Sequence, residues 1–98
     1  MDSFTRSRIQ RLHFKRRAKE RTGKDIPNWG IDKIIVDIMM GRLALIPSRN
    51  RKSYEVYETD GNYFNLKGYF VFDPETEMLV TFLDRSMTPY IEKVVSSR

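Results

Sequence analysis

The hydrophobic period of this chain changes once, near residue 42, and that change limits the possible folds more than any other feature. Before it, four isoleucines follow the i, i+3, i+4, i+7 spacing of one helix face: Ile31, Ile34, Ile35 and Ile38. After it, apolar and polar residues alternate, which is typical of half-buried strands. Helices that precede a run of strands in this way predict an α+β fold, with the helices packed on an antiparallel sheet.

Two N-terminal helices are predicted within the first 41 residues. The first runs from Ser3, whose side chain can cap it, to about Arg21, and a glycine two residues later stops it. The second begins at Asn28 or Gly30, ends at Gly41 and carries the isoleucine face. We expect the second helix to supply the core. The first should rest on the core only in part, because its apolar residues form no continuous stripe.

Four strands follow the helices, which predicts a four-stranded antiparallel sheet in a single domain of 98 residues. The candidate strands are RLALIP (42–47), SYEVYET (53–59), NYFNLKGYFVF (62–72) and MLVTFLD (78–84). The dipeptide Asp60-Gly61 predicts a two-residue hairpin turn between the second strand and the third. Thr88-Pro89 could open a short C-terminal helix, with proline at its first position, or begin a tail.

The third candidate strand has two contrasting faces. One face is apolar and carries Phe64, Leu66, Phe70 and Phe72. The other is polar and aromatic and carries Tyr63, Asn65, Lys67 and Tyr69. Unpaired bases can stack on such a face, which predicts that Lys67 and Tyr69 contact nucleic acid. The alternative is that tyrosine occurs there because aromatic residues favour strands.

Positive charge is concentrated at the N-terminus. Residues 1–24 contain nine Lys or Arg against two carboxylates, a net charge of +7, whereas the rest of the chain has a net charge of −2. This uneven distribution predicts a surface for a polyanion, most simply RNA, although it also fits a solvated helix face without a partner. Arg49, Arg51 and Lys52 form a second basic cluster, between the first two strands.

The composition argues against several other classes of protein. The chain has no cysteine and one histidine, which excludes a disulfide framework and argues against a zinc site, so no metal or cofactor is expected. No apolar run approaches the roughly 20 residues that cross a bilayer, and the basic N-terminus lacks the apolar segment of a signal peptide. We therefore expect a cytoplasmic protein with no membrane partner.

The one histidine, His13, lies in the basic stretch RLHFKRRAKER (11–21). On a helix, residues three or four apart share a face, so this stretch predicts one polar surface, made of His13, Arg16, Arg17, Glu20 and Arg21. Imidazole can move a proton near neutral pH and guanidinium binds phosphate oxygens, and metal-independent RNA cleavage needs both. The arginines lower the pKa of His13 and Glu20 raises it, which leaves the net direction open. The plainer interpretation is a surface histidine beside an Arg–Glu ion pair.

Three stretches of the chain resemble a known group of proteins. The pattern LHFKRRAKERTG, then a helix ending in MMGRLALI, then a meander closing with MLVTFLD, is similar to small toxin-like domains of the barnase, EndoU, colicin and RelE ribonuclease superfamily. These domains share an α-α-β-β-β-β core, and many are toxins of toxin–antitoxin systems or occur on phages and mobile elements. The resemblance implies an endoribonuclease that acts on tRNA or mRNA, with an antitoxin or another inhibitory protein as partner.

The resemblance also implies roles for single residues. His13 would be the acid or base, Arg17 and Arg21 would bind the phosphate, and Thr81 would hydrogen-bond the phosphate or orient the site. If Met78, Val80 and Phe82 face the core, Thr81 lies on the opposite face of the sheet. Leu79 and Leu83 lie on that face too.

RNA would bind across the basic first helix, including Lys15 and Arg16, and across the loop with Arg49, Arg51 and Lys52. Two alternatives use the same scaffold without catalysis. One is a nucleic-acid-binding or regulatory protein, and the other is a module whose basic helix binds an acidic protein.

Overall fold

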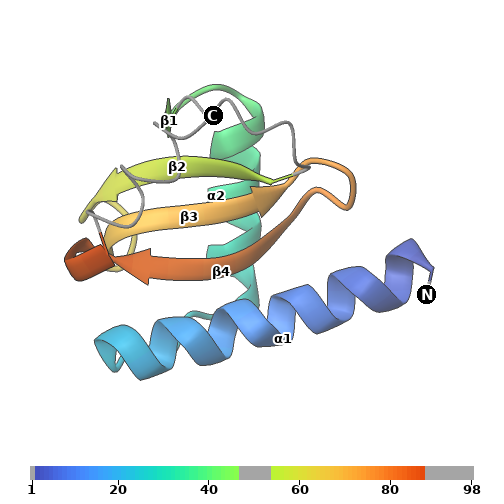
Figure 1. Cartoon of the computed structure of the whole chain (residues 1–98), viewed down its shortest axis with the longest axis horizontal. Coiled ribbons are helices and arrows are strands. Elements are labelled where there is room, and N and C mark those ends of the chain that lie inside the picture. Colours follow the sequence, from blue (N-terminus) through green and yellow to red (C-terminus); the bar gives the residue numbers. More distant parts are fainter. Residues whose placement is uncertain (1, 47–53, 88–98) are drawn as a thin grey trace.

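The computed structural model describes residues 2–46 and 54–87 (Figure 1). In chain order, the elements are helices α1 (Ser3–Thr22) and α2 (Asn28–Met39), strands β1 (Ala44–Ile46), β2 (Glu55–Asp60), β3 (Lys67–Asp73) and β4 (Met78–Asp84), and the 3₁₀ helix η1 (Arg85–Met87). The strands form one antiparallel sheet in the order β1-β2-β3-β4. In Figure 1, α2 crosses behind this sheet and α1 runs beside β4. The predicted α+β fold, with two helices packed on a four-stranded antiparallel sheet, is confirmed.

Both helices begin and end close to their predicted boundaries, with two corrections. Asp2, not Ser3, caps α1, because its Oδ1 accepts the backbone N–H of Thr5 at 2.7 Å. Gly23 ends α1 as expected, in a left-handed conformation with φ of 76°. α2 ends at Met39, two residues before the predicted Gly41.

The core lies between α2 and one face of the sheet. The four isoleucines of the predicted helix face are buried, and three sheet phenylalanines meet them: Phe70, Phe72 and Phe82. From α1 only Phe14 and Ala18 join this cluster, both fully buried, while Leu12 is 66% exposed. As predicted, α1 rests on the core along one narrow side and leaves most of its surface to solvent.

β3 begins at Lys67, so the predicted strand over 62–72 is wrong at its N-terminal end. Phe64 and Asn65 have φ angles of 54° and 59°, a left-handed backbone that a strand cannot contain. The predicted polar and aromatic face therefore does not form, because Tyr63 and Asn65 lie in the loop before the strand. The side chain of Tyr69 lies in the strand but is only 5% exposed.

The connection between β2 and β3 is longer than the predicted two-residue turn. Asp60 pairs with Lys67, so the loop contains residues 61–66, and the N–H of Gly61 donates to the carbonyl of Leu66 at 2.9 Å. The dipeptide does mark the end of β2, but the reversal of the chain needs four further residues.

β4 has the predicted bounds and contains an irregularity. Phe70 pairs with Phe82 and Val71 with Thr81, but Phe72 pairs with Leu79, so the register shifts by one residue. The shift turns Leu79 into the core, where it is fully buried, although strict alternation predicted it on the opposite face. Thr81 lies on the sheet face opposite the core, because it alternates with the core residue Phe82.

Three of the predicted features lie outside the described residues. They are the helix or tail opening at Thr88-Pro89, the end of the first strand at Pro47, and the basic cluster of Arg49, Arg51 and Lys52. Between residues 2 and 87, with 47–53 left aside, no helix combines the length and the apolar character needed to cross a lipid bilayer.

Candidate functional site

α1 is attached to the rest of the molecule along two flanks. On one flank, Arg11 binds Asp32 of α2 at 2.9 Å. On the other, the guanidinium of Arg6 binds two carboxylates of the β3–β4 turn, Asp73 at 2.8 Å and Glu75 at 2.6 Å. We call the second side the β4 flank of α1. His13 follows Arg6 by seven residues, or about two helical turns, so it projects to the β4 flank within about 20°.

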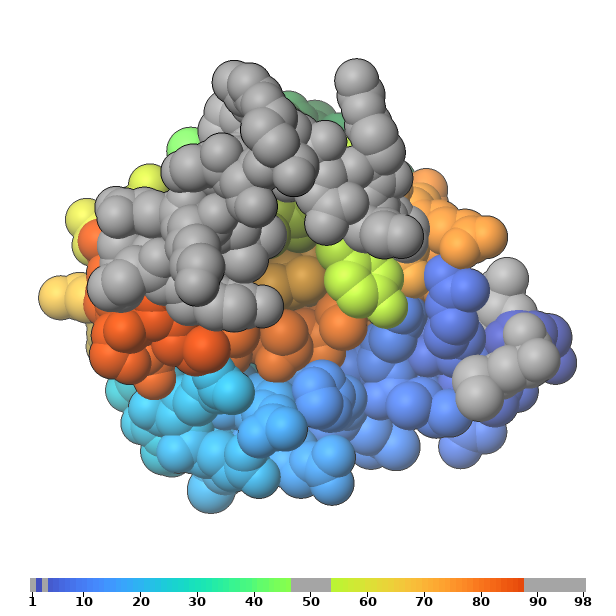
Figure 2. All heavy atoms as spheres, in the orientation of Figure 1, coloured from blue at the N-terminus to red at the C-terminus, as the bar shows by residue number. Residues whose placement is uncertain are grey.

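α1 and β4 run parallel to each other (Figure 1). Arg6 binds Asp73 and Glu75, just before the start of β4, and the guanidinium of Arg21 approaches the sulfur of Met87, just after its end, at 2.9 Å. His13 and Arg17 therefore lie level with the middle of β4, where Thr81 is half-buried. Figure 2 shows the surfaces of α1, in blue to cyan, and β4, in orange, adjoining each other along this side of the molecule.

The electrostatic environment of His13 makes its imidazole a weaker base than usual. Partial burial lowers the pKa of His13, and the positive charges of Arg17, Arg16 and Arg21 lower it further, against the opposing effect of Glu20. The imidazole is therefore mainly neutral at pH 7. In the part of the chain that the structure describes, neither ring nitrogen of His13 has a hydrogen-bond partner, so the neutral ring is free to accept a proton.

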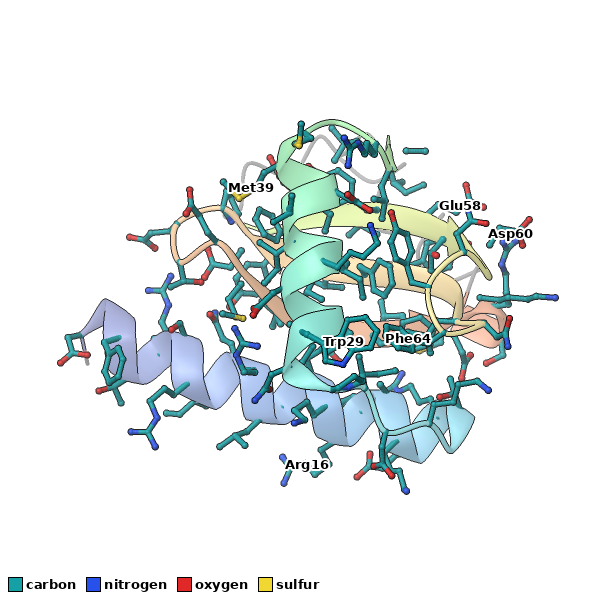
Figure 3. All side chains as sticks on the ribbon, turned by 180° about the vertical axis from the view of Figure 1, so that it is seen from behind. Arg16, Trp29, Met39, Glu58, Asp60 and Phe64 are labelled. Atoms are coloured by element: carbon teal, nitrogen blue, oxygen red, sulfur yellow. The ribbon has the colours of Figure 1, made fainter. Side chains whose placement is uncertain are left out.

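The arginines near His13 differ in how far their charge is compensated. Arg17 donates to Glu20 at 3.1 Å, an exposed i,i+3 ion pair that contributes little to stability. The side chain of Arg16 is exposed and points away from the sheet (Figure 3), and within the described ranges it forms no ion pair. Lys15 projects to the opposite flank, where its Nζ lies 3.4 Å from Oδ1 of Asn28. As helical spacing predicts, the charges of Arg16, Arg17 and Arg21 all act on His13. Lys15 lies on the other flank of α1.

A shallow depression of about 430 Å³ lies at the C-terminal end of α1, which we call the α1-end depression. It is lined by Arg21, Thr22, Asn65, Lys67, Asp84, Arg85 and Ser86. The structure therefore brings together Arg21 and Lys67, which the sequence placed on different elements, and does not bring His13 into the same depression. The sequence reasoning placed Asn65 on the predicted polar face but not among the site residues, and it missed the lining residues Thr22, Asp84, Arg85 and Ser86. Asparagine adopts a left-handed backbone more readily than most residues. Its presence at position 65 could therefore have indicated a loop before the strand.

A second depression, of about 380 Å³, lies at the β1–β2 end of the sheet, lined by residues that include Arg42, Glu58, Asp60 and Arg85. Its cations are compensated. Arg42 binds Asp37 at 2.9 Å, and Arg85 binds Asp60 at 3.0 Å. By contrast, no described carboxylate lies within ion-pair distance of Arg21 or Lys67. Asp84 is the one carboxylate that lines the α1-end depression, and the cations outnumber it there, so this depression is the better place for an anion.

Thr81 and Tyr69, the two predicted site residues on the outer face of the sheet, differ in accessibility. The hydroxyl of Thr81 has no hydrogen-bond partner among the residues described, whereas the ring of Tyr69 is buried and does not offer a face to solvent. Across the same residues, no group of three or more His, Asp or Glu side chains gathers closely enough to hold a metal ion.

No family model matches this chain, and neither the curated proteins nor the solved structures contain a significant match to it.

Proposed function

We propose that the protein is a metal-independent endoribonuclease in which His13 moves the proton. One observation carries the proposal: a half-exposed imidazole with a lowered pKa lies among three arginines, on the flank of α1 that faces β4. A general base works best when its pKa lies close to or below the working pH, because it must be unprotonated to act. The resemblance of LHFKRRAKERTG to toxin-like ribonucleases points to the same residue.

The reaction that suits these groups uses the ribose 2′-hydroxyl as nucleophile. His13 takes the proton of this hydroxyl, and the 2′-oxygen attacks the adjacent phosphorus. The bond between phosphorus and the 5′-oxygen of the next nucleotide breaks, and that oxygen takes a proton from water. The products are a 2′,3′-cyclic phosphate and a free 5′-hydroxyl, while the imidazolium returns its proton to solvent.

Negative charge accumulates on the phosphate oxygens during this step. Arg17 and Arg21 would bind these oxygens, since guanidinium groups donate two parallel hydrogen bonds to an oxyanion. Thr81 would donate its hydroxyl to the phosphate or hold it against β4. RNA as substrate would place the protein in the cytoplasm, and an active nuclease there would require an inhibitory protein partner.

The decisive experiment compares the wild type with His13→Ala on total RNA in the presence of EDTA. We expect the variant to lose about 100-fold or more of the cleavage rate, the usual contribution of a general base. The wild type should leave 2′,3′-cyclic phosphate ends. Equal cleavage by both proteins would exclude His13, and cleavage abolished by EDTA would exclude a metal-independent reaction.

Arg17 and Arg11 offer a matched pair of variants on α1. Each binds one carboxylate, but only Arg17 lies on the β4 flank. Arg17→Ala should lower the cleavage rate by about 100-fold, as the loss of one oxyanion donor does, whereas Arg11→Ala should change it little. Equal losses in both variants would mean that only the total charge of α1 matters.

A second candidate function is nucleic-acid binding without cleavage. The observation that favours it is the α1-end depression, where uncompensated cations gather away from His13. RNA binding that is unchanged in His13→Ala, with no cleavage by the wild type, would identify this function.

A further inference from the structure

An exposed aromatic pair lies beside the α1-end depression. Trp29, the one tryptophan of the chain, is 65% exposed at the start of α2. Its ring lies 5.4 Å from that of Phe64, at an interplanar angle of 55° (Figure 3). Phe64 contacts the indole in a tilted arrangement, and most of the Trp29 side chain remains exposed to solvent. The core does not require so large an exposed ring at this position.

The backbone around Phe64 is arranged at a cost to hold this ring in place. Phe64 and Asn65 both adopt left-handed conformations, which are unfavourable for residues other than glycine and concentrate at functional sites. A Cβ atom added at Gly30 would lie 2.4 Å from Cζ of Phe64, so the ring occupies space that a glycine leaves open. Phe64 also packs against the hydrophobic core, so its left-handed backbone and the glycine seat the ring between the core and Trp29.

The same loop joins the aromatic pair to the uncompensated cations. Phe64 contacts Trp29, and the next residue, Asn65, lines the depression together with Arg21 and Lys67. Two consecutive loop residues thus link an exposed aromatic pair to a depression that holds an amide, several cations and the carboxylate of Asp84. This combination matches the parts of an unpaired nucleotide, namely a flat base and a phosphate.

We propose that this corner of the molecule binds one unpaired nucleotide of an RNA chain. The base stacks on the exposed ring of Trp29, and Lys67 contacts the neighbouring phosphate. Arg21, which the proposed function assigns to the cleaved phosphate, lies between the two sites. The identification of RNA rests on the proposed function, which this inference deepens by assigning the substrate class as single-stranded RNA. A base inside a duplex has both faces covered by its neighbours, so it cannot stack on Trp29.

Arg21 relates this subsite to the proposed cleavage site. It follows His13 by eight residues, a rise of about 12 Å along α1. The stacked nucleotide would therefore lie beyond the cleaved phosphate, and would hold the chain in place while His13 acts.

Trp29 itself reports on the test, because no other tryptophan contributes to the fluorescence. The probe is a single-stranded 2′-O-methyl oligonucleotide, which binds as RNA does but has no 2′-hydroxyl to react. We expect saturable quenching of Trp29 fluorescence by the single strand and much weaker quenching by the same oligonucleotide in a duplex. Quenching of equal depth and affinity by both forms, or none by either, would overturn the proposal.

Variants test the contact by fluorescence anisotropy of a labelled oligonucleotide. Trp29→Ala should weaken binding of the single strand by about tenfold, within the range that one stacked base contributes, and Trp29→Phe should keep most of the affinity. Met39→Ala is the matched control, because Met39 is a similarly exposed apolar residue at the other end of α2 (Figure 3). Unchanged affinity in Trp29→Ala would assign the exposed indole to another contact, such as a protein partner, and would overturn the proposal.

The cation contact has its own pair of variants. Lys67→Gln should weaken binding of the single strand, whereas Arg8→Gln, which removes the same charge near the other end of α1, should have a smaller effect. Because the probe has no 2′-hydroxyl to react, these measurements test the stacking site even if the protein cleaves no RNA.

Discussion

The protonation state of His13 is set by a balance among its neighbours on α1. Glu20 is the one carboxylate that raises the pKa of His13, and it also binds Arg17, whose charge lowers that pKa. In Glu20→Gln both effects act in the same direction, because the variant removes the carboxylate and releases the arginine. The pKa of His13 should fall further below its ordinary value.

The pH dependence of RNA cleavage measures this shift. In the proposed reaction the base form of His13 is required, so the rate should be constant well above the pKa of His13 and decline as the pH falls through it. We expect this decline to occur at lower pH in Glu20→Gln than in the wild type. Asp25→Asn is the control, because Asp25 binds Lys19 on another side of α1. Identical profiles for Glu20→Gln and the wild type would mean that another group titrates.

At the residue scale, the sequence could predict which side chains share a surface but not how they ionise. His13, Arg17 and Arg21 are close because helical spacing is local, and any helix over 11–21 would gather them. The direction of the pKa shift depends on how far α1 is buried against β4, which is a property of the tertiary structure. Tyr69 shows the same limit, since alternation along a strand gives its face but not its exposure.

At the scale of elements, a buried carboxylate fixes α1 to the β3–β4 turn. Asp73 is fully buried, and its Oδ2 accepts from Gln10 at 2.9 Å and from Arg6 at 2.8 Å. Burial alone would raise the pKa of Asp73, but the hydrogen bonds of Gln10 and Arg6 outweigh it and lower the pKa to about 2. The ionised form is therefore the one that holds α1 in position.

Asp73→Asn should destabilise the protein by about 2 kcal/mol at pH 7, the typical worth of hydrogen bonds to a charged group. The wild-type carboxylate has a lower pKa in the folded state than in the unfolded chain, where it is near 3.8. Its stabilisation is thus complete above about pH 5 and is lost as the pH falls towards 2. Urea unfolding at pH 7 and at low pH measures the difference, which should shrink in acid. The control, Glu75→Gln, removes the exposed second carboxylate on Arg6 and should cost much less.

Element boundaries could be predicted where local chemistry decides them. β4 has the predicted bounds, and Gly23 ends α1, because an apolar run and a C-terminal glycine are signals carried by the residues themselves. The start of β3 could not be predicted from alternation, since Phe64 continues the apolar pattern yet has left-handed backbone. Phe64 packs against the core, contacts Trp29 and fills the space over Gly30, and these contacts come from residues far away in the sequence.

At the scale of the whole molecule, charge is separated between α1 and the sheet. Among the described cations of the sheet region, Arg42 is matched by Asp37 and Arg85 by Asp60, and Lys67 at the start of β3 is the exception. α1 carries more cations than its neighbours can match, and Arg16 at its centre forms no ion pair within the described ranges. A polyanion that approaches from solution would therefore meet α1 first, and would be drawn along it to His13 and to the α1-end depression.

The salt dependence of RNA binding tests this separation of charge between α1 and the sheet. Each phosphate that a protein cation neutralises in a single strand contributes about −0.7 to the slope of log affinity against log salt concentration. Arg16→Gln should make the slope shallower by about 0.7 for a 2′-O-methyl oligonucleotide, measured by anisotropy between about 50 and 200 mM salt. Lys33→Gln should leave the slope unchanged, because Lys33 lies on α2 and is matched by Asp37 at 3.4 Å. If both variants change the slope equally, binding responds to net charge alone, and the basic surface of α1 has no special part in it.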